Sequence, residues 1–443
     1  MISGLKEHGG LFFMNNCTTC HIEKSDVNFD AISSFIDGKR QYDFVSRFDY
    51  IREAGCEGEK KAANQLICEL KELGFEPRAE KFFFKAPLIE SSVLKVTEPY
   101  EKEYTVHTFG FCADTEPDGL EAEFVYIENA DDISMKKADG KIVMLNGFVG
   151  CAMVERLKKA GALGFITFSG TPLDTKNSRL PAIRSLGLSS ERLLPGVSIH
   201  YMDALELVEM GASKVRMICR QSVTLHNSQN ICVRIAGSDP DANQILTVTA
   251  HYDSVPAGPG AYDNMAGCAI VMELLRYFAI HKPLRTIEFI WFGAEEKGLL
   301  GSLAYVSEHE NELYEHSFNM NIDLAGQALG GTVLGITADQ SIADQFTKLG
   351  ETFGLGLTAK SAVWSSDSNT FAWKRVPSMT LNRDGFGMHT EHDTISLISA
   401  WSLRRSAVLL CTIADWLANS KNFPLTKEIP EDFLKQLDAA FLR

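Results

Sequence analysis

The sequence predicts an α/β protein built on a doubly wound, mostly parallel sheet that helices cover on both faces. Several apolar segments are short and nearly continuous, among them "QILTVTA" (244–250), "RTIEFIWF" (285–292) and "NMNI" (319–322). Segments of helical character separate them, including one at about 265–281. Apolar strands that alternate with helices are typical of a parallel sheet that is buried on both faces.

Length and composition narrow the class of protein. With 443 residues the chain exceeds the roughly 250 to 300 residues at which one hydrophobic core stops growing, so we expect two domains. The net charge of −15, without a Lys/Arg cluster, argues against a nucleic-acid partner. The longest apolar run, 407–414, is far shorter than the ~18 to 20 residues that span a bilayer, so no membrane span is expected.

The ten cysteines lie mostly singly inside apolar segments. This distribution is typical of reduced core thiols rather than of a disulfide framework. Because no signal peptide precedes the first cysteine, we expect a cytoplasmic protein.

The N-terminal stretch contains "CTTCH" (17–21), the spelling of a covalent haem attachment site. Haem attachment of that kind requires export, and the only preceding apolar run, "LFFM", is too short for a signal peptide. We therefore expect an idle N-terminal arm at 1–30, with a metal-binding or redox Cys17/Cys20 pair as the alternative. A translation start at Met14 instead of Met1 is a further hypothesis.

The first regular elements follow the arm. In "EGEKKAANQLICELKELGFEP" (57–77) the apolar residues recur at helical spacing and Gly74 supplies a stop, which predicts an amphipathic helix. The next segment, "EKFFFKAP" (80–87), is predicted to be a strand. The pattern then breaks and many acidic residues appear between 98 and 132, so we place a domain boundary near residue 95.

A compact unit follows within 95–218. Its sequence "ADGKIVMLNGFVGCAMVERLKKAGALGFITFSG" (138–170) predicts a strand at 141–145, a helix at about 151–159 and a second strand at 164–168. The main domain then resumes, so that 31–94 and 219–420 together form one discontinuous domain. The last residues, 421–443, are predicted to place a surface helix on it.

Polar residues follow the predicted strands of the main domain at the ends where ligands bind in such sheets. These residues are His251, Asp253, Glu295, Glu296, Asp323 and His389, and Asp263 joins them from the turn "GPGAYDN" (258–264). Singly, each is a weak signal, since a carboxylate after a strand is usually a cap or a solvated loop. Because all of them fall on the same rim of one sheet, we expect a metal site there.

The residue types fit two zinc-class ions. Ions of this kind lie about 3.5 to 4 Å apart and require a carboxylate that bridges them, with imidazole and carboxylate ligands on each. Asp263 is the candidate bridge. One ion would take His251 and Asp323 in addition, and the other would take Glu296 and His389.

Two further carboxylates have predicted roles beside the metal. Asp253 follows His251 by two residues and so faces the same side of an extended chain, where it can accept the second ring N–H of a metal-bound imidazole. Glu295 and Glu296 point in different directions because they are adjacent. Glu296 can then coordinate while Glu295 faces the water as general base.

Six motifs together resemble the co-catalytic di-zinc aminopeptidases of metallopeptidase clan MH, of the aminopeptidase Y type. The motifs are "HYDS", "GPGAYDNMAG", "FGAEEKGLLGS", "NIDLAG", "WSSDSNTFAWKRVPSMTL" and "HTEHDT". The resemblance implies a zinc-exopeptidase fold, two Zn²⁺ per chain at the five ligand positions, Glu295 as base and Asp253 as orienting residue. It also implies a peptide bond between Asp263 and Asn264 that is often cis. The unit at 95–218 resembles the protease-associated domain that such enzymes carry as an insertion.

Some details depart from the family pattern or rest on it alone. His389 and His392 could each supply the last ligand by spacing, and only the resemblance favours His389. Many relatives have a tyrosine shortly before this histidine, whereas this chain has "RDGFGMH" (383–389), so Arg383 or a backbone N–H would support the tetrahedral intermediate. Relatives also often have a histidine where this chain has Ser368.

We expect a metal-dependent exopeptidase that removes N-terminal residues from peptide substrates. A carboxypeptidase, dipeptidase or amidohydrolase on the same scaffold is the alternative, and it should show a basic cluster, for which Arg383, Lys374 and Arg375 are the local candidates. A single-zinc glutaminyl cyclase and a non-catalytic binding module are further alternatives. Trp291, Trp364 and Trp373 are expected to pack in the core rather than line a substrate pocket. The oligomeric state is not predicted.

Overall fold

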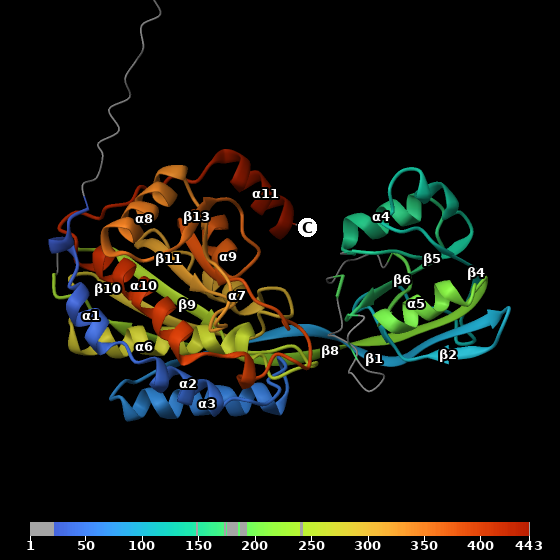
Figure 1. Ribbon diagram of the computed structural model, residues 1–443, viewed down its shortest axis with the longest axis horizontal. Coiled ribbons are helices and arrows are strands. Elements are labelled where there is room, and N and C mark those ends of the chain that lie inside the picture. Colours follow the sequence, from blue (N-terminus) through green and yellow to red (C-terminus); the bar gives the residue numbers. More distant parts are fainter. Residues whose placement is uncertain are drawn as a thin grey trace, which may run out of the picture.

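The chain folds into two lobes that a long antiparallel ribbon connects (Figure 1). The computed structural model describes residues 22–147, 149–171, 174, 185–186, 193–239 and 242–442. The helices are α1 (Phe29–Phe35), α2 (Gly38–Ser46), α3 (Glu57–Glu72), α4 (Cys151–Lys159), α5 (Tyr201–Glu209), α6 (Ala266–Ile280), α7 (Leu300–Glu308), α8 (Gln340–Phe353), α9 (Ser368–Trp373), α10 (Ala400–Asn419) and α11 (Glu431–Phe441). Short helical turns lie at η1 (Lys24–Asp26), η2 (Ser134–Lys137), η3 (Ala261–Met265) and η4 (Ile395–Leu397).

The strands join in one sheet that runs through both lobes. They are β1 (Arg78–Glu98), β2 (Lys102–Tyr104), β3 (Val106–Thr108), β4 (Leu120–Tyr126), β5 (Lys141–Met144), β6 (Gly164–Ser169), β7 (Gly196–His200), β8 (Lys214–Ile235), β9 (Ile245–His251), β10 (Thr286–Phe292), β11 (His316–Ile322), β12 (Thr332–Thr337), β13 (Thr358–Ser361) and β14 (Ser378–Arg383). Their order is β13-β12-β14-β11-β9-β10-β8-β4-β5-β6-β7-β3, with β1 paired to β8 and β2.

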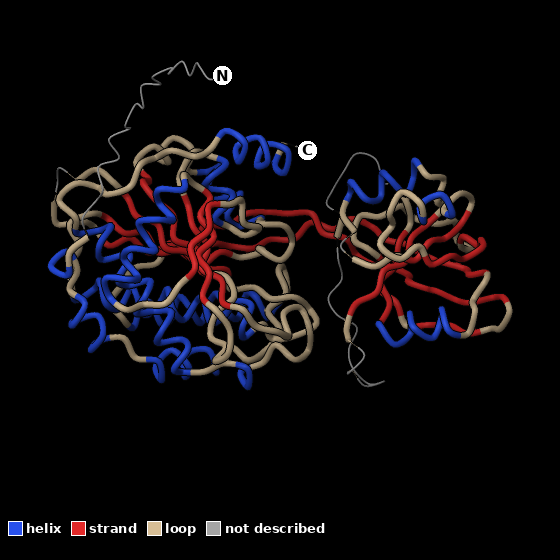
Figure 2. The backbone as a smooth tube through the Cα atoms, turned by 45° about the horizontal axis from the view of Figure 1, so that its top comes forward, coloured by secondary structure: helices blue, strands red, loops and turns tan. Residues whose placement is uncertain are grey.

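The larger lobe has the expected doubly wound architecture. Strands β14, β11, β9 and β10 lie side by side and parallel at its centre. Strand β12 pairs antiparallel with β14, and strand β8 pairs antiparallel with β10. Figure 2 shows the strands in the middle of this lobe with helices on both sides. On one face α6 and α10 belong to the largest buried cluster, and on the other Tyr305 of α7 and Phe371 of α9 pack on Ile290 and Phe292 of β10.

Helix α6 is buried along almost its whole length, because it is apolar on all sides. It begins one residue after the expected start and directly continues from η3. The tight connection means that the core of the lobe fixes the position of the η3 turn. This turn carries Asp263.

The smaller lobe has a separate hydrophobic core. This core gathers apolar residues of β3 to β7, α4 and α5 and of the distal halves of β1 and β8. The predicted strand–helix–strand unit at 138–170 is present as β5, α4 and β6. The expected boundary at residue 95 falls inside β1, because β1 and β8 pair from Arg78↔Cys232 to Glu98↔Lys214 and carry the chain from one core into the other.

Both ends of the described chain lie on the larger lobe. Ile22 and Val27 are buried in its core. Helix α11 packs on α9 through Trp373, whose indole Nε1 donates to Asp438 at 3.0 Å. The "CTTCH" motif and Met14 lie outside the described residues. Among the helices of the described part, none combines the length and the apolar character that a bilayer crossing requires.

Candidate functional site

The carboxyl ends of the central strands bring the predicted site residues together. His251 is the last residue of β9 and pairs in register with Phe292 of β10, which leads into Glu295 and Glu296. Asp323 directly follows β11, the other parallel neighbour of β9. All of these side chains are buried or half-buried, and they face a common space.

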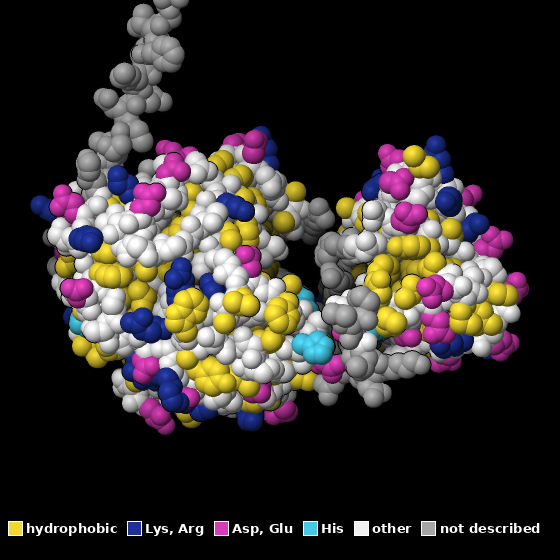
Figure 3. All heavy atoms as spheres, viewed as in Figure 1, with side chains coloured by type: hydrophobic (Ala, Val, Ile, Leu, Met, Phe, Trp, Pro, Cys, Tyr) yellow, Lys and Arg dark blue, Asp and Glu magenta, His cyan; other side chains and the backbone are white. Residues whose placement is uncertain are grey.

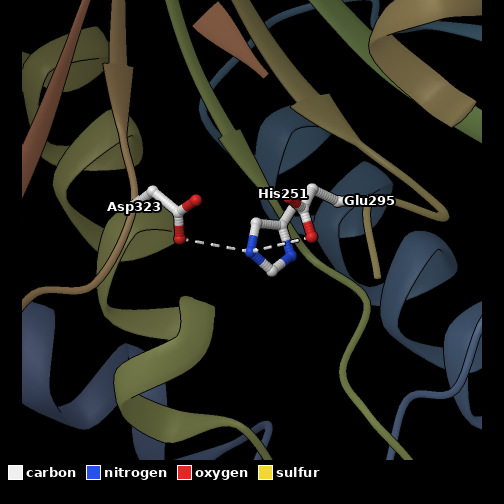
Figure 4. Close-up of side chains that lie close together, drawn as sticks. All are labelled: His251, Glu295 and Asp323. Carbon is white, nitrogen blue, oxygen red and sulfur yellow. Dashed lines mark ion pairs between the residues drawn. The ribbon is translucent and has the colours of Figure 1, made fainter. Parts of the chain in front are cut away.

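His251 lies at the centre of a first cluster. Its Nε2 is 3.1 Å from Asp263 Oδ1, 3.5 Å from Asp323 Oδ1 and 3.9 Å from Glu295 Oε2. Figure 4 shows Asp323 and Glu295 on opposite sides of the imidazole ring. Three carboxylates therefore converge on one ring nitrogen.

A second cluster forms around His389. Its Nε2 is 3.1 Å from Asp263 Oδ2 and 3.1 Å from Glu296 Oε2. Asp263 thus directs one carboxylate oxygen to each imidazole, which is the arrangement that a bridging ligand needs. His392, the alternative ligand by spacing, has no atom in either cluster.

The charges of the site fit a bound cation. Asp263, Glu295, Glu296 and Asp323 crowd around only two histidines. Burial, reinforced by neighbouring carboxylates, raises the pKa of Glu295 well above its ordinary value and also raises that of Glu296. Burial opposes charge on His389, but Glu296 and Asp263 outweigh it and raise its pKa to about 11. Imidazole and carboxylate donors with excess negative charge suit zinc-class ions.

Two buried atoms of the site have no hydrogen-bond partner among the described residues. They are Nδ1 of His251 and Oε1 of Glu296. An unpartnered buried polar atom is costly, and metal ligation is one way to relieve that cost for Glu296. This observation gives independent support for a metal beside the second cluster.

Asp253 differs from its expected contact. Its Oδ1 is 3.4 Å from Nδ1 of His251, and no hydrogen bond forms between them. The two oxygens instead accept the backbone N–H groups of Glu295 at 3.0 Å and Glu296 at 3.1 Å. In this structure Asp253 therefore holds the two glutamates in place.

The η3 turn presents Asp263 through a cis peptide bond to Asn264, as the family resemblance implied. Asp393 accepts the backbone N–H of Tyr262 at 2.6 Å and of Asp263 at 3.0 Å. Asn264 donates to the carbonyl of Ile322 at 2.7 Å. These contacts fix the candidate bridging carboxylate between the two histidines.

Comparison with known proteins relates part of the larger lobe to a family. Residues 230–414 match the model of peptidase family M28. This segment is an M28 peptidase domain. The match includes every predicted site residue.

Two curated relatives of the M28 domain are aminopeptidases by name. Aminopeptidase YwaD of Bacillus subtilis is 29% identical over 282 residues, which cover 62% of this chain and 58% of that protein. Leucine aminopeptidase 2 of Trichophyton equinum is 28% identical over 268 residues, or 56% of this chain and 52% of that protein. The chain thus spans a little over half the length of these relatives.

Solved structures share the fold. A zinc aminopeptidase from Bacillus subtilis superimposes with a TM-score of 0.72 at 24% identity, over 90% of this chain and 99% of that one. A peptidase M28 precursor from Shewanella amazonensis gives a TM-score of 0.75 at 23% identity, over 91% and 98% of the two chains. Both alignments cover the two lobes, since each includes about nine tenths of this chain.

Three side chains that support the M28 site were not predicted from the sequence. Ser366 donates to Asp323 Oδ2 at 2.5 Å and accepts from Asn321 at 2.7 Å. Arg52, which is fully buried, donates to the carbonyls of Tyr252 at 2.7 Å and Gly260 at 3.0 Å and so ties down the loop between His251 and Asp263. The third, Glu59, lies against the backbone of Gly293, two residues before Glu295.

Several other expected residues lie away from the reacting groups of the M28 domain. The guanidinium of Arg383 donates to the carbonyls of Gln327 and Ala328 and to the hydroxyl of Thr332. Ser368 is buried and shares a 2.6 Å hydrogen bond with Thr380. Trp291 is a core residue, as expected.

His392 contacts the smaller lobe. Its Nε2 is 3.7 Å from Oδ1 of Asp174, whose other oxygen is 3.0 Å from Nε2 of His200 at the end of β7. Figure 3 shows histidine side chains on the face of the larger lobe that turns toward the smaller one. The M28 site therefore lies beside the junction of the two lobes.

Proposed function

We propose that the chain is an aminopeptidase that removes N-terminal residues from peptides with the help of two zinc ions. The observation that carries this proposal is the carboxylate of Asp263, which directs one oxygen to each of two histidines. His251 and Asp323 would complete one site, and Glu296 and His389 the other. The names of the curated relatives support the reaction class.

Zinc ions bound at these positions would lower the pKa of water and polarise the scissile carbonyl. Glu295 is the base of the reaction in this proposal. Its Oε2 lies 3.9 Å from Nε2 of His251, and its side chain is 14% exposed, so it faces the space between the ligands. Glu295 takes the proton of the attacking water and delivers it to the departing amine.

The same acidic surroundings would hold the substrate. A free α-amine is positively charged at neutral pH, and the rim of carboxylates attracts it. A carboxypeptidase would instead need a cation for the terminal carboxylate. The guanidinium of Arg383 donates to the carbonyl of Gln327, and Lys374 pairs with Glu310 at 2.6 Å. Neither residue therefore supports a carboxypeptidase.

We also propose that the smaller lobe is an inserted protease-associated domain, with limits near 95 and 218, that restricts access to the site. The contact between His392 and Asp174 supports this, because it joins the lobe to the loop that carries His389. A cytoplasmic location stays a prediction. It agrees with the free thiols of all eight cysteines in the described part of the chain.

Aminoacyl-4-nitroanilides and their N-acetylated forms would test the activity. We expect cleavage of the free-amine substrates only, loss of more than about 100-fold in kcat for Glu295→Gln, and wild-type activity for the exposed control Glu310→Gln. A chelator should abolish activity, and zinc should restore it at two ions per chain. Cleavage of the acetylated substrates, or activity at one zinc per chain, would contradict the proposal.

A further inference from the structure

The turn that carries the two glutamates has an irregular backbone. It follows β10 as Gly293, Ala294, Glu295 and Glu296, and Ala294 adopts a left-handed conformation with φ of 54°. A non-glycine residue in that region carries a conformational cost, so surrounding contacts must impose it. The position of the Glu295 carboxylate depends on these contacts.

Asp253 supports one side of the turn, through the N–H groups of Glu295 and Glu296 described above. A second carboxylate, that of Glu59 on the first turn of α3, supports the other side. It accepts hydrogen bonds from the hydroxyl of Ser228 at 2.5 Å and the N–H of Gly55 at 2.7 Å, and the N–H of Ala294 lies near enough to favour its charged form. Two carboxylates thus face three successive N–H groups of the turn.

The contact between Glu59 and the turn is close. A Cβ atom at Gly293 would lie 2.7 Å from Glu59 Oε1 and 2.2 Å from Ser228 Oγ, so the backbone rests directly on these two side chains. Only a glycine fits at this position. Because no space separates Glu59 from the turn, a movement of the Glu59 side chain would also move the backbone of the turn.

Burying the carboxylate of Glu59 at this position has a free-energy cost. It is 3% exposed, and no lysine, arginine or histidine of the described chain forms an ion pair with it. Burial and the nearby Asp253 raise the pKa of Glu59 to about 7. A neutral side chain could anchor the start of a helix without this cost. The N–H groups that face the carboxylate of Glu59 explain better why a charged side chain is present.

We propose that Glu59 is a positioning residue for Glu295, acting with Asp253 to hold the Gly293–Ala294–Glu295–Glu296 turn. It does not touch the substrate. The functional part of this inference rests on the proposed peptidase activity. The structural part concerns Glu296 as well, because this candidate ligand lies on the same turn.

The test compares the zinc-loaded full chain with its Glu59→Gln variant. We expect kcat to fall about tenfold or more with KM within twofold, since a small misplacement of a base costs rate rather than binding. The affinity for zinc, measured by competition with a chromophoric chelator, should fall about tenfold. Glu57→Gln, on the same helical turn with its side chain 91% exposed, should match the wild type in every measurement.

A double-variant experiment separates positioning from general loss of structure. If Glu59 acts through Glu295, then Glu59→Gln should have little further effect on kcat in a Glu295→Gln background. An equal loss in both backgrounds, or wild-type kcat and zinc affinity in Glu59→Gln, would overturn the proposal. Should Glu59→Gln not fold, Ser228→Ala removes one contact of the carboxylate and should reduce zinc affinity severalfold, and an unchanged affinity would overturn the proposal.

The two proposals fail in different ways. A wild-type chain that binds zinc but cleaves no peptide would contradict the proposed function. The zinc affinity of the Glu59→Gln variant would still decide whether Glu59 holds the turn.

Discussion

Single buried side chains hold the loops of this site by bonding to backbone atoms. Arg52 illustrates the principle, since its guanidinium donates to carbonyls of the segments around residues 48–50, 252 and 259–260. Arg52 is fully buried, and this burial lowers the pKa of its guanidinium. The backbone N–H of Arg52 also donates to the hydroxyl of Ser254 in the loop between His251 and Asp263, at 2.9 Å.

We predict that Arg52→Met reduces the free energy of unfolding by about 3 kcal/mol or more. The substitution fills much of the volume but leaves several buried carbonyls without donors, each of which costs about 1 to 3 kcal/mol. Urea denaturation of the metal-free protein would measure the change. Arg47→Met is a suitable control, because Arg47 is 47% exposed and its ion pair with Glu69 should contribute less than about 1 kcal/mol. Equal losses for the two variants would contradict the prediction.

Some residues of the site were predictable from the sequence, and others were not. The candidate ligands were predictable, because each follows an apolar strand or sits in a Gly-rich turn, and the carboxyl ends of parallel strands meet at one edge. Arg52 and Glu59 lie in ordinary helical and loop contexts some 200 residues before their partners. Their roles depend on tertiary contacts that leave no local pattern. Ser366 could have been found, since it belongs to a quoted motif.

At the scale of the element, the order of strands and helices was predictable and their ends were less so. Apolar periodicity predicted α3, α6 and the β5–α4–β6 unit within a residue or two at most ends. The length of β1 was not predicted, because its pairing with β8 continues past the point where the composition changes. Backbone pairing with β8 extends β1 past residue 95, where the side-chain composition suggested a domain boundary.

Strand β11 begins with a buried histidine that gives the fold a pH dependence. His316 is fully buried with Nδ1 2.7 Å from the hydroxyl of Thr247, and burial lowers its pKa to about 4. Between pH 4 and 6.5 the unfolded chain therefore binds a proton at this histidine that the folded chain does not bind. The free energy of unfolding should fall as the pH drops through this window.

We predict that His316→Gln removes this part of the pH dependence. Denaturant unfolding between pH 4.5 and 7 should give a slope for the variant that is flatter by about 1.4 kcal/mol per pH unit. The total difference across the window should be about 3 kcal/mol, from a shift of about 2.5 units. Parallel curves for the two proteins would show that His316 does not titrate in this way.

The whole molecule places the site between a rigid sheet and a second lobe. The core of the larger lobe fixes η3 and α6, while the smaller lobe reaches the site through Asp174 and His392. Asp174 is 13% exposed in its side chain and also accepts the N–H of Thr171 at 2.7 Å, so it is well anchored in the smaller lobe. The contact between Asp174 and His392 lies where it can limit the access of substrates to the site.

We predict that Asp174→Asn increases kcat/KM for a polypeptide of about 20 residues relative to a dipeptide by severalfold. The pair with His392 is partly exposed, so its coupling energy should be under about 1 kcal/mol, and the asparagine keeps an oxygen that can accept the N–H of Thr171. Peptide hydrolysis with substrates of graded length would measure the ratio. Asp132→Asn, on the same lobe with its side chain 98% exposed, should leave the ratio unchanged. An unchanged ratio in Asp174→Asn would show that this contact does not restrict access.

The ribbon of β1 and β8 has a consequence for how such a chain can change. Phe84 and His226 are register partners beside Ala294 and Gly55 of the larger lobe, so the chain leaves for the smaller lobe and returns from it at two neighbouring points. A turn of a few residues could close the hairpin there and leave the central strands, η3 and the seven site residues in place. The fold thus permits the loss or exchange of the smaller lobe by a single recombination event, and access to the site can evolve independently of its chemistry.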